Sequence, residues 1–174
     1  MEAPERQESR ARREAVSAET KGRSLRALPQ PTRRPNPLWL GARVLGALSL
    51  LAVGAVHLQQ YSTLYSEIPT IGTLFVLNFL GATAIGLGLL APVERLLGRW
   101  GGPALALLSL GGIALAATAF VFLLISERTP LFGFMEPGYD PQAIMFARVT
   151  EVATVALLGT YSVARLLRVP TGNW

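Results

Sequence analysis

The sequence contains no cysteine, so disulfide bonds, thiolate metal sites and thiol catalysis are excluded. It has one histidine and one lysine, and arginine supplies the other basic side chains. A single histidine cannot form a zinc site without several further ligands. Many of the basic residues lie in one N-terminal segment, so the net charge of +5 does not by itself indicate a nucleic-acid partner.

Four long stretches of the sequence also contain few charged residues or none. The approximate bounds of these apolar stretches are 38–58, 70–93, 103–126 and 142–167. Each is close to the ~20 residues that a helix needs to cross a bilayer. The second and third lack the charged face of a soluble amphipathic helix. The pattern predicts an all-α fold, a four-helix transmembrane bundle with up-down topology, because the connections are short.

Prolines and small residues add detail to this bundle. Pro69, Pro103 and Pro141 are expected at helix starts, where proline loses no needed N–H. Small residues spaced by four favour close helix contacts in lipid, and these pairs are Ala82/Gly86, Ala84/Gly88 and Gly112/Ala116. Aromatic residues near the helix ends fit the belts at membrane interfaces, and they are Trp39, Tyr61, Tyr65 and Trp100.

The segments outside the apolar stretches define the domain organisation. Residues 1–37 carry nine basic and five acidic side chains, which predicts a disordered basic cytoplasmic tail. Residues 38–168 form the predicted transmembrane domain, and residues 169–174 form a short cytoplasmic end. The tail could contact anionic lipid, or its charge could serve only to orient the chain. The arginines that would make the lipid contact are Arg23, Arg26, Arg33 and Arg34.

The distribution of basic residues predicts the orientation. Residues 94–102 contain Arg95 and Arg99, and the C-terminal end contains Arg165 and Arg168. The other two loops, 59–69 and 127–140, contain only Arg128. Since basic residues favour the cytoplasmic side, both termini are expected in the cytoplasm. The excess of arginine over lysine and the abundant Ala, Leu and Gly favour a bacterial cell (inner) membrane.

Glu151 is the most unusual polar residue, because it lies about ten residues inside the fourth stretch. At roughly 1.5 Å per residue, this places it ~15 Å from the start of the helix. An unpaired carboxylate at that depth is costly. Arg148 lies on the same helical face and is the expected partner. The pair could be structural, or the carboxyl group could respond to protons or to a ligand in an outward-open cavity.

Two other polar residues are expected in the same half of the membrane. Asn78 could provide a packing hydrogen bond between helices, or it could join the Arg148–Glu151 pair. His57 could be an interfacial residue satisfied by headgroups, or it could sense pH, relay protons or bind a metal. His57, Asn78, Arg148 and Glu151 therefore form the candidate functional cluster.

The segment His57–Asn78, HLQQYSTLYSEIPTIGTLFVLN, resembles a pattern in small uncharacterised four-helix membrane proteins of actinobacteria. In that pattern a His-Leu ends the first helix and Ile-Pro-x-Ile-Gly-x-Leu-Phe leads into the second. The resemblance covers about an eighth of the chain, together with the four-span topology, and that topology is also similar to DoxX-type proteins. It implies an architecture and no particular activity.

Three classes of function are open at this point. The first is a non-enzymatic accessory or structural component of a membrane complex, in contact with lipid and with other membrane subunits. The alternative is a small transporter or ligand-binding membrane protein that uses an outward-facing polar vestibule around Glu151. A redox protein with haem or quinone would have only His57 and Met135 as an axial pair. No catalytic grouping, cofactor site, metal site or nucleic-acid partner is predicted.

Overall fold

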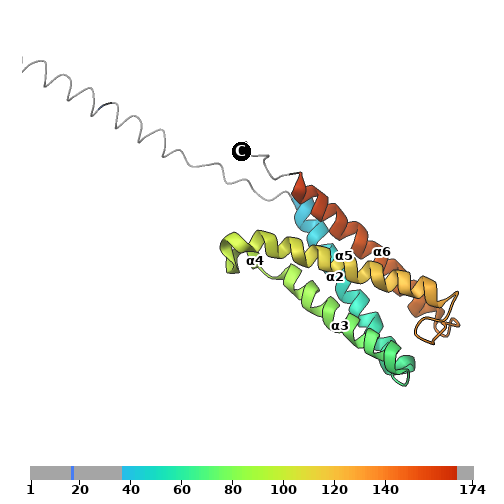
Figure 1. The fold of residues 1–174 in the computed structure, drawn as a ribbon. Helices are drawn as coiled ribbons and strands as arrows, with labels where there is room; N and C mark the ends of the chain where they lie inside the picture. Colours follow the sequence, from blue (N-terminus) through green and yellow to red (C-terminus); the bar gives the residue numbers. More distant parts are fainter. Residues whose placement is uncertain (1–16, 18–36, 168–174) are drawn as a thin grey trace, which may run out of the picture. The chain divides into compact units, whose positions relative to one another are not determined.

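The computed structural model describes residue 17 and residues 37–167. The predicted tail, apart from residues 17 and 37, and the predicted cytoplasmic end 169–174 therefore lie outside the described residues. Residues 37–167 all belong to one compact unit. Figure 1 shows that residues 37–167 form long helices joined by turns and loops.

Four long helices make up the bundle: α2 (Pro37–Gln60), α3 (Pro69–Leu90), α5 (Gly101–Ser126) and α6 (Pro141–Leu166). All four are long and apolar enough to cross a membrane. No strand is present among the described residues, which contain one isolated bridge between Leu131 and Phe134. The predicted all-α four-helix bundle is confirmed, and the chain is a multi-pass membrane protein.

Two connections contain helical turns where the sequence predicts plain loops. After α2 the chain continues as a π-helix, η1 (Tyr61–Tyr65). The hydroxyl groups of Ser62 and Thr63 donate to the Gln59 carbonyl oxygen, at 2.8 and 2.9 Å, inside this extension. Between α3 and α5 the chain forms α4 (Val93–Leu96) and the 3₁₀-helix η2 (Gly98–Trp100).

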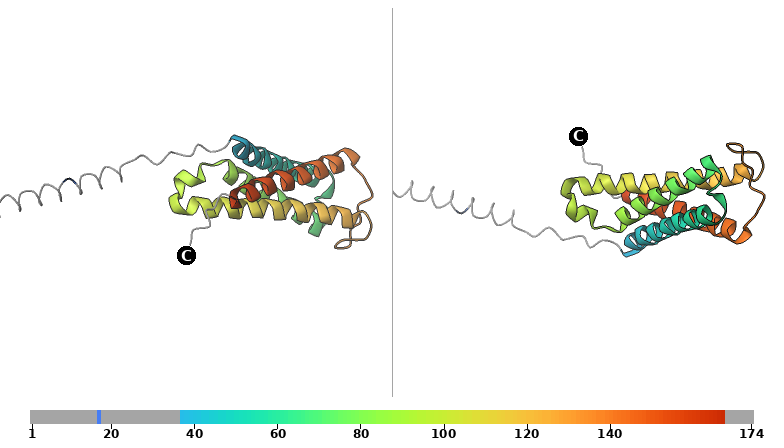
Figure 2. Two further views of the ribbon diagram at one scale, coloured as in Figure 1. Left: turned by 90° about the horizontal axis from the view of Figure 1, so that it is seen from above. Right: turned by 90° about the horizontal axis from the view of Figure 1, so that it is seen from below.

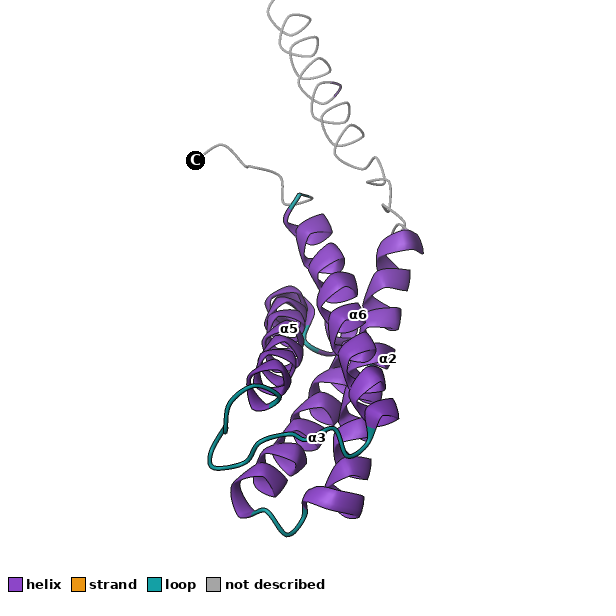
Figure 3. Cartoon of the chain, turned by 90° about the vertical axis from the view of Figure 1, so that its right-hand side faces the viewer, coloured by secondary structure: helices purple, strands orange, loops and turns teal. Residues whose placement is uncertain are grey.

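The helices pack in a closed order. α2 lies against α3 and α6, α5 lies against α6, and α3 meets α5 less extensively. Figure 2 shows the α5–α6 connection projecting beyond one end of the bundle, and Figure 3 looks onto that end. We call this end, which carries residues 61–68 and 127–140, the loop end. The opposite end, which carries residues 91–100, is the α4 end.

The helix starts follow the local sequence. Pro69 and Pro141 occupy the first turns of α3 and α6, as predicted. The Asp140 carboxylate accepts a hydrogen bond from the Ala143 N–H at 3.0 Å and so caps α6. Pro103, by contrast, does not open its helix, because α5 already begins at Gly101. The two glycines before Pro103 continue directly from η2.

Arg43, the only charged residue in the first span, is used at the α4 end. Its Nε donates to the Leu89 carbonyl oxygen at 2.7 Å, and one of its terminal nitrogens donates to the Ala91 carbonyl oxygen at 2.9 Å. These carbonyl groups lie at the end of α3, where the helix has no partners of its own for them. Arg43 therefore ties α2 to the end of α3.

Two of the three small-residue pairs lie at helix contacts, as their spacing predicts, whereas Ala84 of the third pair is exposed. Ala82 and Gly86 of α3 and Gly112 and Ala116 of α5 are buried. A Cβ atom on Gly86 would lie 2.8 Å from Leu51 of α2. One on Gly112 would lie 2.8 Å from Leu158 of α6. These positions have no room for larger side chains, so the helices approach closely there.

Gly72 provides a test of how the loop end is built. A Cβ atom there would lie 2.8 Å from the backbone oxygen of Tyr65. We therefore expect Gly72→Ala to lower the melting temperature of the purified protein, since overpacking costs ~1–3 kcal/mol. The matched control is Gly41→Ala, which has nothing within 4 Å of the added Cβ. The control should be neutral or stabilising, because alanine favours helix. Equal melting temperatures for the two variants would contradict this packing.

Candidate functional site

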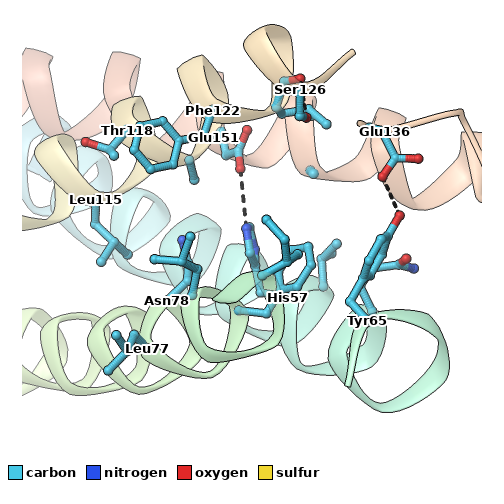
Figure 4. Close-up of a pocket in the computed structure, with 18 of the residues that line it drawn as sticks. His57, Tyr65, Leu77, Asn78, Leu115, Thr118, Phe122, Ser126, Glu136 and Glu151 are labelled. Atoms are coloured by element: carbon cyan, nitrogen blue, oxygen red, sulfur yellow. Dashed lines mark hydrogen bonds and ion pairs between the residues drawn. The ribbon is translucent and has the colours of Figure 1, made fainter. Parts of the chain in front are cut away.

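A cavity of about 520 Å³ lies between the helices toward the loop end (Figure 4). Its volume is in the range of small-molecule sites. Walls come from all four long helices, and Leu131, Phe134 and Glu136 of the loop between α5 and α6 cover it. Most of the lining is aliphatic or aromatic. The apolar lining includes Ile71, Leu74, Phe75, Leu77, Leu115, Phe122, Leu123 and Ile144.

The contacts between α3 and α5 explain why the cavity forms at this end. Leu108 packs over Gly88, and Leu115 packs over Gly81, where a Cβ atom would lie 3.1 and 3.0 Å away. The contact at Gly88 is nearer the α4 end of the bundle, and the contact at Gly81 is the one nearer the loop end. Closer to the loop end, α3 and α5 present lining residues in place of such contacts. The cavity occupies the space between them.

His57 of α2 and Glu151 of α6 face each other across the cavity wall (Figure 4). The His57 Nε2 lies 3.9 Å from a Glu151 oxygen, Oε1. Glu151 is only 1% exposed and His57 is 8% exposed. This contact joins two helices that are far apart in the sequence and adjacent in the bundle.

The other ring nitrogen of His57 fixes its tautomer. His57 Nδ1 lies 2.9 Å from the Val53 carbonyl oxygen. A carbonyl oxygen can only accept, so Nδ1 carries the hydrogen. In the neutral ring, Nε2 is then a bare acceptor that faces the Glu151 carboxyl group. A carboxylate opposite a bare nitrogen, both buried, is unfavourable. A proton on the Glu151 carboxyl group removes this conflict, so the carboxyl group is expected to be neutral.

Two buried oxygen atoms at this site have no hydrogen-bond partner: Oδ1 of Asn78 and Oε2 of Glu151. Asn78 lies on α3 and Glu151 on α6, and both line the cavity. Leaving a buried polar atom unsatisfied costs about 1–3 kcal/mol. The two atoms thus lack partners that a bound molecule or water could supply.

Polar contacts close the cavity at the loop end. The Tyr65 hydroxyl donates to Glu136 Oε2, and the other Glu136 oxygen accepts from the Gly138 N–H at 2.8 Å. Beside them, the Gln60 amide donates to Asp140 at 3.0 Å. The Tyr65 ring packs on Phe75, with ring centroids 4.9 Å apart. We call the contacts of Tyr65 with Glu136 and of Gln60 with Asp140 the polar clasp.

The opening of the cavity faces sideways. Its three exposed lining residues are Leu77 on α3 and Ala114 and Thr118 on α5. Leu77 lies eight residues after the start of α3, or ~12 Å at roughly 1.5 Å per residue. Two lining residues at the loop end, Tyr65 and Glu136, are buried. The mouth therefore lies at a depth where a spanning helix meets hydrocarbon. The outward-facing vestibule expected from the sequence stays a prediction.

The structure brings together three of the four residues in the candidate cluster. His57, Asn78 and Glu151 line the cavity, whereas Arg148 does not. The expected ion pair of Arg148 with Glu151 is wrong, because the Arg148 guanidinium binds the Glu127 carboxylate. Glu127 immediately follows α5, so this pair links α5 to α6 near the loop end. The spacing within α6 indicated Glu151, on the same helix, as the partner of Arg148. In the folded protein the partner is Glu127, from the segment after α5.

The sequence missed the polar clasp. Tyr65 fits an aromatic belt by position, but it is 3% exposed and hydrogen-bonded inside the protein. Glu136 is also buried. No sequence pattern connects these two residues, which lie 71 positions apart. Among the residues near the clasp, only the adjacent residues Asp140 and Pro141 give a recognisable sequence signal, that of a helix start.

The donor set does not fit a metal centre. Among residues 17 and 37–167, no group of three or more His, Asp or Glu side chains lies close enough to hold a metal ion. The cavity instead combines an apolar lining with a few convergent polar atoms, which is typical of sites for small organic molecules.

The fold and the cavity thus define an integral membrane protein with a ligand-sized internal site. Comparison of the chain with protein-family models, with curated proteins and with solved structures finds no match.

The N-cap residue Asp140 predicts a dependence on acid. Its pKa is lowered by the hydrogen bond from the Ala143 N–H and then by that from the Gln60 amide. A carboxyl group with a lowered pKa in the folded state stabilises above its unfolded pKa. That contribution is lost as the pH falls through the folded value. Asp140→Asn keeps a capping oxygen and does not titrate. Melting curves against pH should thus fall less steeply at acid pH for Asp140→Asn than for wild type, and parallel curves would contradict this.

Proposed function

We propose that the protein is a small-molecule-binding membrane protein, either a carrier or a receptor, whose ligand occupies the cavity between α3 and α5. The observation that carries the proposal is the combination of a cavity of about 520 Å³ with two unpartnered buried oxygen atoms, on Asn78 and Glu151. An apolar molecule with a polar end would bury its body against the lining and satisfy these atoms.

The lateral mouth supports access from the bilayer. Leu77, Ala114 and Thr118 surround it, and none of them carries a charge. A molecule dissolved in the lipid would reach the cavity without crossing the polar clasp. We further propose that the loop end faces outward in a bacterial cell membrane, with both termini in the cytoplasm. The support is the concentration of basic residues in the other segments of the sequence. Kinship with the four-helix actinobacterial proteins remains a prediction.

A second candidate is the accessory or structural subunit of a membrane complex. It is supported by the outer face of α6, where Ala156 and Thr160 are exposed and a Cβ atom on Gly159 would meet open space. Small residues on an exposed face would let a partner helix approach closely. This candidate does not account for the unpartnered oxygen atoms in the cavity.

One substitution separates the two candidates. Ala119 lines the cavity, so Ala119→Trp should fill part of the cavity and block a ligand. We expect 4-phenyl-1-butanol, a neutral apolar probe, to bind wild-type protein in lipid nanodiscs and to bind Ala119→Trp at least ~10-fold more weakly. Titration calorimetry measures both affinities.

The matched control is Ala156→Trp, which adds the same side chain to the exposed face of α6. It should bind the probe as wild type does and should release a protein partner if the accessory role holds. Binding that is unchanged in Ala119→Trp contradicts the proposed site. If Ala156→Trp releases a protein partner and wild type binds no probe, the accessory role is favoured.

A further inference from the structure

We infer that the site takes a ligand ending in a primary ammonium group, and that this ligand replaces a proton carried by Glu151. The inference rests on the proposed function, because it names the class of ligand for the same cavity. It is carried by the kinds of polar atoms that face the cavity and by the partners that they already have.

The fully buried side-chain atoms that lack a partner in the cavity lining are acceptors. Glu151 Oε2 and Asn78 Oδ1 have no partner. His57 Nε2 is an acceptor as well, because its Nδ1 hydrogen is committed to the Val53 carbonyl group. They come from three different helices and line one cavity. An alkylammonium group has three N–H donors and no acceptor, so it matches this set of three acceptors.

Several donors that line the cavity are already engaged. The Tyr65 hydroxyl donates to Glu136, and the Gln60 amide donates to Asp140. The Ser126 hydroxyl donates to the Leu123 carbonyl oxygen at 2.9 Å. A ligand carboxylate, which only accepts, would find few free donors and would face Glu151. A hydroxyl group has one hydrogen to donate and so would satisfy one of the three acceptors.

The charged groups around the site leave Glu151 as the counter-ion. Helices α3 and α5 contribute no charged lining residue. Glu136 is held by Tyr65 and by the Gly138 N–H. Arg148, one turn from Glu151, is bound to Glu127. Phe75 lies 5.1 Å from the His57 ring and offers an aromatic face near a bound cation.

Charge balance determines what happens to the proton. Without a ligand, the Glu151 carboxyl group carries one proton and faces the bare nitrogen of His57. When R–NH₃⁺ binds, the Glu151 carboxyl group gives its proton to solvent and becomes a carboxylate that accepts from the ammonium group. One cation enters and one proton leaves, so the buried site keeps the same total charge. This avoids the cost of an extra uncompensated charge in the membrane.

The test uses three probes with the same apolar body and different heads: 4-phenylbutylamine, 4-phenyl-1-butanol and 4-phenylbutyrate. Wild-type protein in lipid nanodiscs is titrated calorimetrically in two buffers with different ionisation enthalpies, which counts the protons released. We expect the amine to bind about tenfold more tightly than the alcohol, since charge-assisted hydrogen bonds are roughly twice as strong as neutral ones. Its binding should release close to one proton, and that of the alcohol none.

Three variants support this reading. Glu151→Gln should remove the amine preference and the proton release while keeping alcohol binding within about twofold. Asn78→Leu should weaken amine binding and leave proton release intact, and it covers the case in which Glu151→Gln does not fold. Glu94→Gln makes the same change of charge at an exposed glutamate of α4, outside the cavity lining, and should behave as wild type.

The outcomes separate the two proposals. If amine and alcohol bind equally, or if the amine releases no proton, the inference about the ligand is overturned and the proposed cavity site stands. If the butyrate binds most tightly, the inference is also overturned. If no probe binds to wild type, the proposed function itself fails.

Discussion

The burial of Glu151 is the constraint on which the arrangement of the loop end depends. A carboxyl group at the middle of a membrane helix needs a partner that does not add charge to the hydrocarbon. The partner is His57, the only histidine of the chain, and its tautomer is held by the Val53 carbonyl group on the same helix. The contact requires α2 and α6 to be neighbours with their polar residues at the same depth. It also keeps one carboxyl oxygen free toward the cavity.

The rest of the bundle divides into a tightly packed half and a half that encloses space. Toward the α4 end, glycines such as Gly86 and Gly112 allow close packing, and Arg43 ties the end of α3 to α2. Toward the loop end, α3 and α5 do not close on each other. At this end the polar clasp joins η1 and α2 to the segment between α5 and α6, and the pair of Arg148 with Glu127 joins α6 to the end of α5. These contacts tie the segments of the loop end to one another beside the cavity.

The sequence predicts those parts of the structure that depend on local chemistry. Long uncharged runs identify the four helices, and Pro69 and Pro141 identify two of their starts, because bilayer thickness and proline geometry act on single segments. Small-residue spacing correctly identifies two of three helix contacts, and it is wrong for the exposed Ala84. The sequence does not predict the partner of Arg148, the burial of Tyr65 or the lateral mouth. Each of these depends on how segments far apart in the chain meet, and residue spacing within one helix carries no such information.

The central claim is that Glu151, opposite the bare nitrogen of His57, is a neutral carboxylic acid when the cavity holds no cation. Infrared difference spectroscopy of wild-type protein and Glu151→Gln in lipid at neutral pH tests it directly. The account predicts a carbonyl stretching band of a protonated carboxylic acid that is present in wild type, absent in Glu151→Gln and lost when 4-phenylbutylamine is added. A carboxylate band assigned to Glu151 in the ligand-free protein would contradict the account.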